Sequence, residues 1–320
     1  MVRIDRYLTP ADLAASLRED VRAGLTASPK VLPPKYFYDG RGSALFEDIT
    51  RLPDYYPTRA ERSILAARAD DVADLTKART LVELGSGSSE KTHLLLRALR
   101  GVGSLETYVP VDVSVDAVEG ALPDLVEAYP GLLVHGVVAD FERHLHRLPT
   151  DGPRLVAFLG GTIGNFEPAQ RARFLSAVGA TLRPGDAFLL GTDLVKDPAR
   201  LVRAYDDPTG VTAAFDLNVL HVVNRELGAD FDVTAFDHVA VWDPASEWIE
   251  MRLRSRVTQT VRVPGLDLVV DFAAGEELRT EISAKFRRPG VEAELEAAGL
   301  RPTRWWTDDD GDFALSLALA

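Results

Sequence analysis

Apolar residues in the first quarter of the chain recur at helical spacing. Helices are predicted over residues 10–27 and 58–75. Residues 32–40 (LPPKYFYDG), which lie between them, combine prolines and aromatic residues without apolar periodicity. We therefore expect a loop there. In the first predicted helix, the recurring apolar residues are Leu13, Leu17, Val21 and Leu25.

From residue 80 onward, short apolar runs alternate with helical patterns. The expected strands cover residues 80–84, 107–112, 133–139, 154–160 and 186–192, and the expected helices lie near 89–100, 114–128 and 168–182. Several strands are nearly continuous apolar runs, such as residues 155–159 (LVAFL), which is typical of parallel strands buried on both faces. The pattern predicts an α/β fold with a doubly wound parallel sheet.

The regular alternation stops near residue 195. The expected later elements are a helix over 213–224, strand-like runs at 238–242, 250–263 and 266–272, a helix over 290–298, and strands at 303–306 and 313–319. The simplest architecture is a sheet whose last elements return after an inserted region. We therefore expect a sheet domain of residues 60–195 plus 286–320, and a second α+β domain of residues 6–59 plus 196–285.

Composition narrows the possible partners. The 320-residue chain has a formal net charge of −13, which argues against a nucleic-acid substrate. It contains no cysteine, so disulfides and thiolate metal sites are excluded. His144 and His146 are only two residues apart and lack a metal-ligand pattern, so we expect no metal. No apolar run is long enough to span a bilayer, and no secretory signal is present. We expect a cytoplasmic monomer without a membrane partner.

Residues 80–92 (TLVELGSGSSEKT) are typical of a strand, a small-residue turn and a helix start. Such a turn lets a ligand lie against the backbone, and it serves dinucleotides, nucleoside triphosphates and S-adenosylmethionine. Glu90 stands where both phosphate-binding motifs have glycine. Its carboxylate would repel a phosphate, so the sequence favours S-adenosylmethionine.

The amino-acid end of S-adenosylmethionine carries an ammonium and a carboxylate. Glu83, the backbone of Gly85, and Lys91 could bind these two groups.

Acids also end the next two strands. Asp112 could accept both ribose hydroxyls. Asp140 could accept from the adenine amino group while Phe141 packs on the base. The alternative is that Asp112 and Asp140 only cap helices.

The fourth strand ends in residues 158–166 (FLGGTIGNF). Its glycines permit close backbone approach, and the amide of Asn165 suits a polar group of amino-acid size. The alternative is that Asn165 is only a turn residue in a left-handed conformation.

The chain resembles the histidine Nα-methyltransferases of ergothioneine biosynthesis nearly end to end. The glycine-rich turn alone would be a weak match, but residues 55–59 (YYPTR) and 280–286 (TEISAKF) make the resemblance specific. The other matching segments are residues 35–40, 45–46, 52–54, 83–88, 158–166, 191–193, Tyr205 and Arg279. Ser88 stands where many methyltransferases have a third glycine.

The resemblance implies a class I, Rossmann-like methyltransferase that trimethylates the α-amino group of L-histidine to give hercynine, with S-adenosylmethionine as the methyl donor. The sheet domain would bind the donor and the second domain the substrate. The implied donor-binding residues are Gly85, Lys91, Asp112, Asp140 and Phe141. The implied histidine-binding residues are Tyr55, Asn165, Tyr205, Glu281 and Ser283, with Tyr38, Phe46 and Met251 lining the pocket; Asn165 and Tyr38 are the expected catalytic residues.

The chemistry of histidine fits the Glu281–Ser283 pair. Glu281 can accept the imidazole N–H, and Ser283 reaches the same side if the segment is extended. The alternative is that Glu281 is a surface acid paired with Arg279 or Lys285. Other hypotheses are a methyltransferase for another amine, a non-catalytic S-adenosylmethionine-binding regulator, and a nucleotide-binding oxidoreductase.

Overall fold

The computed structural model describes all residues except Ser88 and Glu90. Two predictions rest on these residues, namely that Glu90 would repel a phosphate and that Ser88 takes the place of a third glycine. Both therefore concern residues outside the described part of the chain. The chain forms two compact units. The first consists of Met1–Leu8, Pro57–Val195 and Lys285–Ala320, and the second of Thr9–Tyr56 and Lys196–Ala284. Among the described residues, no helix combines the length and apolarity that crossing a membrane requires.

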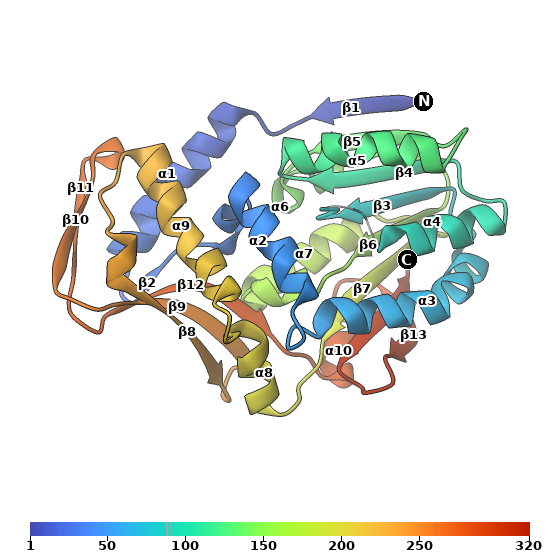
Figure 1. Cartoon of the computed structure of the whole chain (residues 1–320). Helices are drawn as coiled ribbons and strands as arrows, with labels where there is room; N and C mark the ends of the chain where they lie inside the picture. The colour runs from blue at the N-terminus through green and yellow to red at the C-terminus, as the bar shows by residue number, and fades with distance from the viewer. Residues whose placement is uncertain (88, 90) are drawn as a thin grey trace. The chain divides into compact units, whose positions relative to one another are not determined.

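The first unit is built on a mostly parallel sheet with the order β1-β5-β4-β3-β6-β7-β14-β13 (Figure 1). Its strands are β1 (Val2–Arg6), β3 (Thr80–Leu84), β4 (Thr107–Asp112), β5 (Leu133–Val138), β6 (Arg154–Phe158), β7 (Ala187–Asp193), β13 (Arg301–Thr307) and β14 (Phe313–Leu319). The predicted α/β class and parallel core are confirmed. β14, however, runs antiparallel to both β7 and β13. β1, an edge strand parallel to β5, was not predicted.

Helices cover both faces of this sheet. They are α3 (Pro57–Thr76), α4 (Thr92–Gly101), α5 (Val115–Ala128), α6 (Phe141–His144), α7 (Pro168–Thr181) and α10 (Arg288–Ala297). Apolar residues of α3, α4 and α5 share one core with Leu81 and Leu155. Side chains alternate along a strand, so Phe158 points to the opposite face from Leu155. The Phe158 ring lies 4.8 Å from that of Phe174 in α7. The sheet is therefore doubly wound.

The second unit packs helices on a smaller sheet with the order β2-β12-β9-β8, beside a β10-β11 hairpin. Its strands are β2 (Lys30–Val31), β8 (Phe236–Asp243), β9 (Trp248–Ser255), β10 (Gln259–Val263), β11 (Leu268–Phe272) and β12 (Glu277–Ala284). Its helices are α1 (Pro10–Thr26), α2 (Gly40–Arg51), α8 (Pro198–Tyr205) and α9 (Val211–Leu227), with a short 3-10 helix at Pro34–Phe37.

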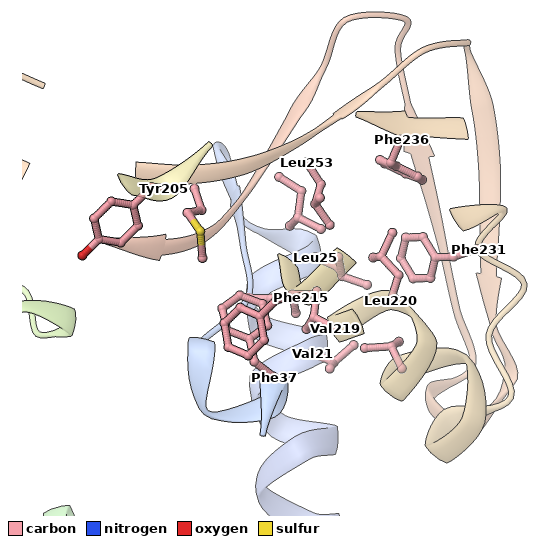
Figure 2. Close-up of a cluster of buried hydrophobic side chains, with 14 of the residues drawn as sticks. Val21, Leu25, Phe37, Tyr205, Phe215, Val219, Leu220, Phe231, Phe236 and Leu253 are labelled. Carbon is pink, nitrogen blue, oxygen red and sulfur yellow. The ribbon is translucent and has the colours of Figure 1, made fainter. Parts of the chain in front are cut away.

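Apolar side chains from these helices and the sheet form one core. Figure 2 shows Leu25 of α1, Phe37, and Phe215 of α9 gathered with Leu253 of β9. Tyr205 lies apart from these side chains, and its hydroxyl points away from them (Figure 2). Tyr205, the last residue of α8, therefore lies at the edge of the apolar core with its polar hydroxyl directed out of it (Figure 2).

The sequence predicted most elements but missed some boundaries. The strand-like run 250–263 is two strands, β9 and β10, which pair with different partners. Helix α2 (Gly40–Arg51) was not predicted, because it starts with two glycines in three residues, a composition typical of loops. Tertiary packing explains one of them. A Cβ on Gly42 would lie 1.6 Å from the carbonyl oxygen of Phe37, so α2 approaches this backbone at a distance that only glycine allows.

We predict that Gly42→Ala lowers the free energy of unfolding by at least about 1 kcal/mol, because α2 has to move away from Phe37. Gly40→Ala is the matched control in the same helical turn, since its Cβ would meet no atom within 4 Å. Urea unfolding of both variants measures the difference. Equal stability of the two variants would show that the close approach is unimportant.

Candidate functional site

The glycine turn after β3 borders open space at the carboxyl edge of the large sheet. Gly85 and Gly87 have φ values of +69° and +49°, which glycine adopts without strain. A Cβ on Gly87 would meet no atom within 4 Å, and one on Gly85 would lie 3.8 Å from the ring of Phe141. A ligand can therefore approach the turn backbone, with the Phe141 ring beside it. This geometry fits the adenosyl and amino-acid parts of S-adenosylmethionine.

Asp112 fixes this turn from the neighbouring strand. Its Oδ2 accepts the N–H of Gly87 at 3.1 Å, and its Oδ1 accepts the N–H of Ser114 at 2.9 Å. The cap of α5 is Ser114, whose hydroxyl accepts from Ala117. Asp112 is thus not a helix cap. Burial raises the pKa of its carboxyl, against the lowering effect of these backbone N–H groups. Each oxygen has a further lone pair for a ligand hydroxyl.

Asp140 caps a helix, as the alternative hypothesis proposed. It is the N-cap of α6, and its Oδ1 accepts the N–H of Glu142 at 2.9 Å. The next residue, Phe141, packs its ring edge-on against Phe158 at 5.3 Å. The cap therefore also orients the ring that borders the glycine turn. Binding of adenine by Asp140 stays a prediction.

The Glu83 side chain lies on the buried side of this turn and forms its hydrogen bonds within the protein. It shares a strand face with Leu81, toward α4, and only 4% of it is exposed. Its carboxylate accepts the hydroxyls of Thr92 and, at 2.5 Å, of Tyr108. The Tyr108 hydroxyl also lies 2.8 Å from that of Ser89, beyond the turn. The proposed contact of Glu83 with the donor's ammonium was therefore wrong, because the period-2 alternation of the strand turns this side chain inward.

Lys91 lies beside a second glycine turn. Gly160 and Gly161 follow β6 with φ values of +77° and +69°. Glu61 of α3, which is fully buried, accepts the N–H of Gly160 at 2.7 Å and forms an ion pair with the Lys91 ammonium. Glu61 thus holds both Lys91 and the glycine turn, a role that the sequence analysis missed. The available signal was an acid on the apolar face of α3, three residues before Ile64.

Asn165 ends the short 3-10 helix Thr162–Asn165 that follows these glycines. It is half-buried, and the next residue, Phe166, packs 6.4 Å from the ring of Phe141. The backbone of Asn165 is in a helical turn and does not have a positive φ, so the alternative of a left-handed turn residue was wrong. The first unit therefore brings together Gly85, Lys91, Asp112, Asp140, Phe141 and Asn165 at the carboxyl ends of four neighbouring strands.

The second unit brings together the other predicted residues. The hydroxyls of Tyr205 and Ser283 lie 2.7 Å apart. Glu281 opposes Met251 across the β12–β9 ladder, so both side chains point to the same face of the sheet as Ser283. Glu281 is 8% exposed, and the hypothesis that it is a surface acid is therefore wrong.

A row of aromatic rings continues from Tyr205. The Tyr55 ring lies 6.2 Å from Tyr205 and 6.3 Å from Phe46, and Phe46 lies 5.6 Å from Tyr38. Each of these contacts is edge-on, an arrangement favoured by the ring quadrupoles. Phe215 of α9 supports both Tyr38 and Phe46, at 5.4 and 5.8 Å. Phe215 was not among the site residues predicted from the sequence, because it has the pattern of an ordinary core residue.

The first unit has a mostly parallel, doubly wound sheet with an antiparallel β14 between β7 and β13 and a glycine turn after β3, an arrangement typical of Rossmann-like domains that bind a ligand at the carboxyl ends of their strands. Residues 17–320 match the family model described as "Histidine-specific methyltransferase, SAM-dependent". The chain belongs to this family, and its co-substrate is S-adenosylmethionine.

Curated relatives support this assignment. The chain is 59% identical to the histidine N-alpha-methyltransferase of Mycolicibacterium smegmatis over 98% of both chains. It is 60% identical to the protein of the same name from Mycobacterium tuberculosis, over 95% of this chain and 94% of that one. It is also 32% identical to the ergothioneine biosynthesis protein 1 of Neurospora crassa, over 87% of this chain and 32% of that protein.

We predict a pH-dependent stability that originates at Glu83. Burial raises the pKa of its carboxyl from 4.5 to about 7, although the hydroxyls of Thr92 and Tyr108 oppose the shift. Between these values the folded protein holds a proton that the unfolded chain has released. The free energy of unfolding therefore falls as pH rises through this window, by at most about 3 kcal/mol from this group.

Glu83→Gln removes this titration while keeping the side-chain shape. Urea unfolding of the variant and the wild type at pH 5, 6, 7 and 8 gives the difference in stability. We expect the variant to gain stability relative to the wild type as pH rises. A difference that is constant across this range would contradict the assignment.

Proposed function

We propose that this protein trimethylates the α-amino group of L-histidine to give hercynine, in the first step of ergothioneine biosynthesis. The observation that carries the proposal is the buried polar cluster of Tyr205, Glu281 and Ser283 in the second unit. A family whose description is histidine-specific supplies the substrate class.

The cluster suits an imidazole ring. A neutral imidazole has one N–H donor and one acceptor. The Glu281 carboxylate takes the donor, and the Ser283 hydroxyl, which lies two residues along the same strand, donates to the acceptor. The Glu281 carboxylate also selects for histidine, because an imidazole N–H can form a hydrogen bond with it that an apolar side chain cannot form.

Bound S-adenosylmethionine supplies a methyl group on a sulfonium. On our proposal, the first unit orients this donor through the Gly85–Gly87 turn, Asp112 and Lys91. The substrate amine has to be uncharged and in line with the methyl group. Asn165 and Tyr38 are the polar side chains that we assign to hold this amine. Orientation of this kind contributes about 7–11 kcal/mol to lowering such barriers.

The row of aromatic rings explains how the product of each step can remain bound. Every transfer makes a more substituted ammonium, which forms fewer hydrogen bonds and presents more methyl surface. The faces of Tyr38, Phe46 and Tyr55 attract such a cation through their ring quadrupoles. This supports three successive transfers to one nitrogen, with one proton released at each.

We predict that purified protein incubated with S-adenosylmethionine and each standard amino acid in turn adds methyl groups to L-histidine alone, with a gain of three methyls. Mass spectrometry of the amino acid measures the gain. Methylation of another amino acid without histidine would replace the substrate but keep the reaction class. Absence of transfer to all of them would refute the proposed activity.

A further inference from the structure

Three buried polar side chains lie behind the proposed amino-acid site and have no role in the proposed function. They are Asp216 of α9, His238 of β8 and Thr280 of β12. The side chains of Asp216 and His238 are 0% and 2% exposed, and Thr280 is 1% exposed. All three belong to the second unit. Buried polar groups of this kind cost stability unless they are hydrogen-bonded to one another.

His238 makes a hydrogen bond with each ring nitrogen. Its Nδ1 lies 2.6 Å from Oδ2 of Asp216, and its Nε2 lies 2.8 Å from the carbonyl oxygen of Tyr205. A carboxylate and a carbonyl oxygen both only accept. Both ring nitrogens therefore donate, which requires the imidazolium form, since a neutral imidazole has a single N–H. The charge of Asp216 balances that of the ring.

The surroundings of His238 agree with this protonation state. Burial alone would lower its pKa, but the hydrogen bond and charge of Asp216, the Tyr205 carbonyl and the charge of Asp206 raise it above its ordinary value. His238 of β8 lies opposite Leu253 of the neighbouring strand β9. The neighbouring charged residues of β9, Glu250, Arg252 and Arg254, alternate to the other face of the sheet.

Thr280 connects this pair to the proposed substrate strand. The β12–β9 register places Arg279 opposite Arg252 and Glu281 opposite Met251, so Thr280 is the extra residue of a β-bulge. Its hydroxyl donates to Oδ1 of Asp216 and lies 3.0 Å from the Met251 carbonyl oxygen.

The bulge decides where Glu281 points. Without the extra residue, Thr280 would oppose Met251 and Glu281 would oppose Glu250, on the outer face. A one-residue shift of this kind turns every following side chain over, including that of Ser283.

We propose that His238, Asp216 and Thr280 are positioning residues for the amino-acid site: they hold the bulge that turns Glu281 and Ser283 inward, and they fix the end of α8 that carries Tyr205. This inference rests on the proposed function. One network thereby holds both sides of the Tyr205–Ser283 hydrogen bond.

The first test compares Thr280→Val with Thr280→Ser. Valine keeps the shape of threonine but cannot donate to Asp216, whereas serine keeps the hydroxyl. We expect Thr280→Val to raise the KM for L-histidine about tenfold, the effect of losing one buried hydrogen bond. The KM for S-adenosylmethionine should stay unchanged, and Thr280→Ser should behave as the wild type. Equal changes in both KM values, or no rescue by serine, would refute the positioning role.

The second test uses pH. His238→Gln cannot supply two charge-assisted donors at any pH, whereas the wild type loses one of its two N–H donors as pH rises above the His238 pKa. The KM for L-histidine of the variant, divided by that of the wild type, should therefore be largest near pH 7 and fall toward one at alkaline pH. The ratio removes the titration of the substrate amine, which both proteins share. A ratio that is independent of pH would contradict the role of the second N–H.

These outcomes separate the inference from the proposed function. If the wild type does not methylate histidine, the proposed function fails before any variant is compared. If the wild type is active and Thr280→Val has an unchanged KM for histidine, only the positioning role fails. Because Thr280→Val keeps the His238–Asp216 ion pair, this test also holds if His238→Gln does not fold.

Discussion

The bulge at Thr280 is the constraint on which the proposed amino-acid site depends. Side chains alternate between the two faces of a strand. One extra residue therefore determines which of the side chains after the bulge in β12 face the helices of the second unit. With it, the inner face carries Glu281 and Ser283 beside Met251, and Tyr205 completes the cluster. The outer face carries ion pairs instead, such as those of Arg252 with Glu250 and Glu277.

The first unit follows a similar principle at its glycine turns. Each turn is held by a buried acid, and the turn at Gly85–Gly87 also has open space beside Gly87. Glu83 lies under the turn at Gly85–Gly87 and reaches past it to Thr92. Glu61 holds the turn at Gly160 together with Lys91. Left-handed glycines provide the close approach, while the buried carboxylates fix the loops that carry them.

The sequence was sufficient for the α/β class and for most elements, because the buried strands and amphipathic helices have strong periodicity. It could not give the direction of β14, since the apolar run FALSLAL suits a parallel and an antiparallel strand equally. Nor could it place Glu83, Glu61 or Thr280, whose roles depend on partners 9 to 99 residues away in the chain. Motifs identified the candidate residues, but the orientation of each side chain required the packed structure.

We propose that acids in the two units have separate tasks: Asp112 binds the methyl donor and Glu281 binds histidine. Calorimetric titration of Asp112→Asn and Glu281→Ala with S-adenosylhomocysteine and with L-histidine tests this directly. We predict that Glu281→Ala weakens histidine binding roughly tenfold to a hundredfold, because the variant loses one charge-assisted hydrogen bond. Its affinity for S-adenosylhomocysteine should stay unchanged. Asp112→Asn should show the opposite pattern. Equal losses for both ligands in either variant would contradict the division of tasks.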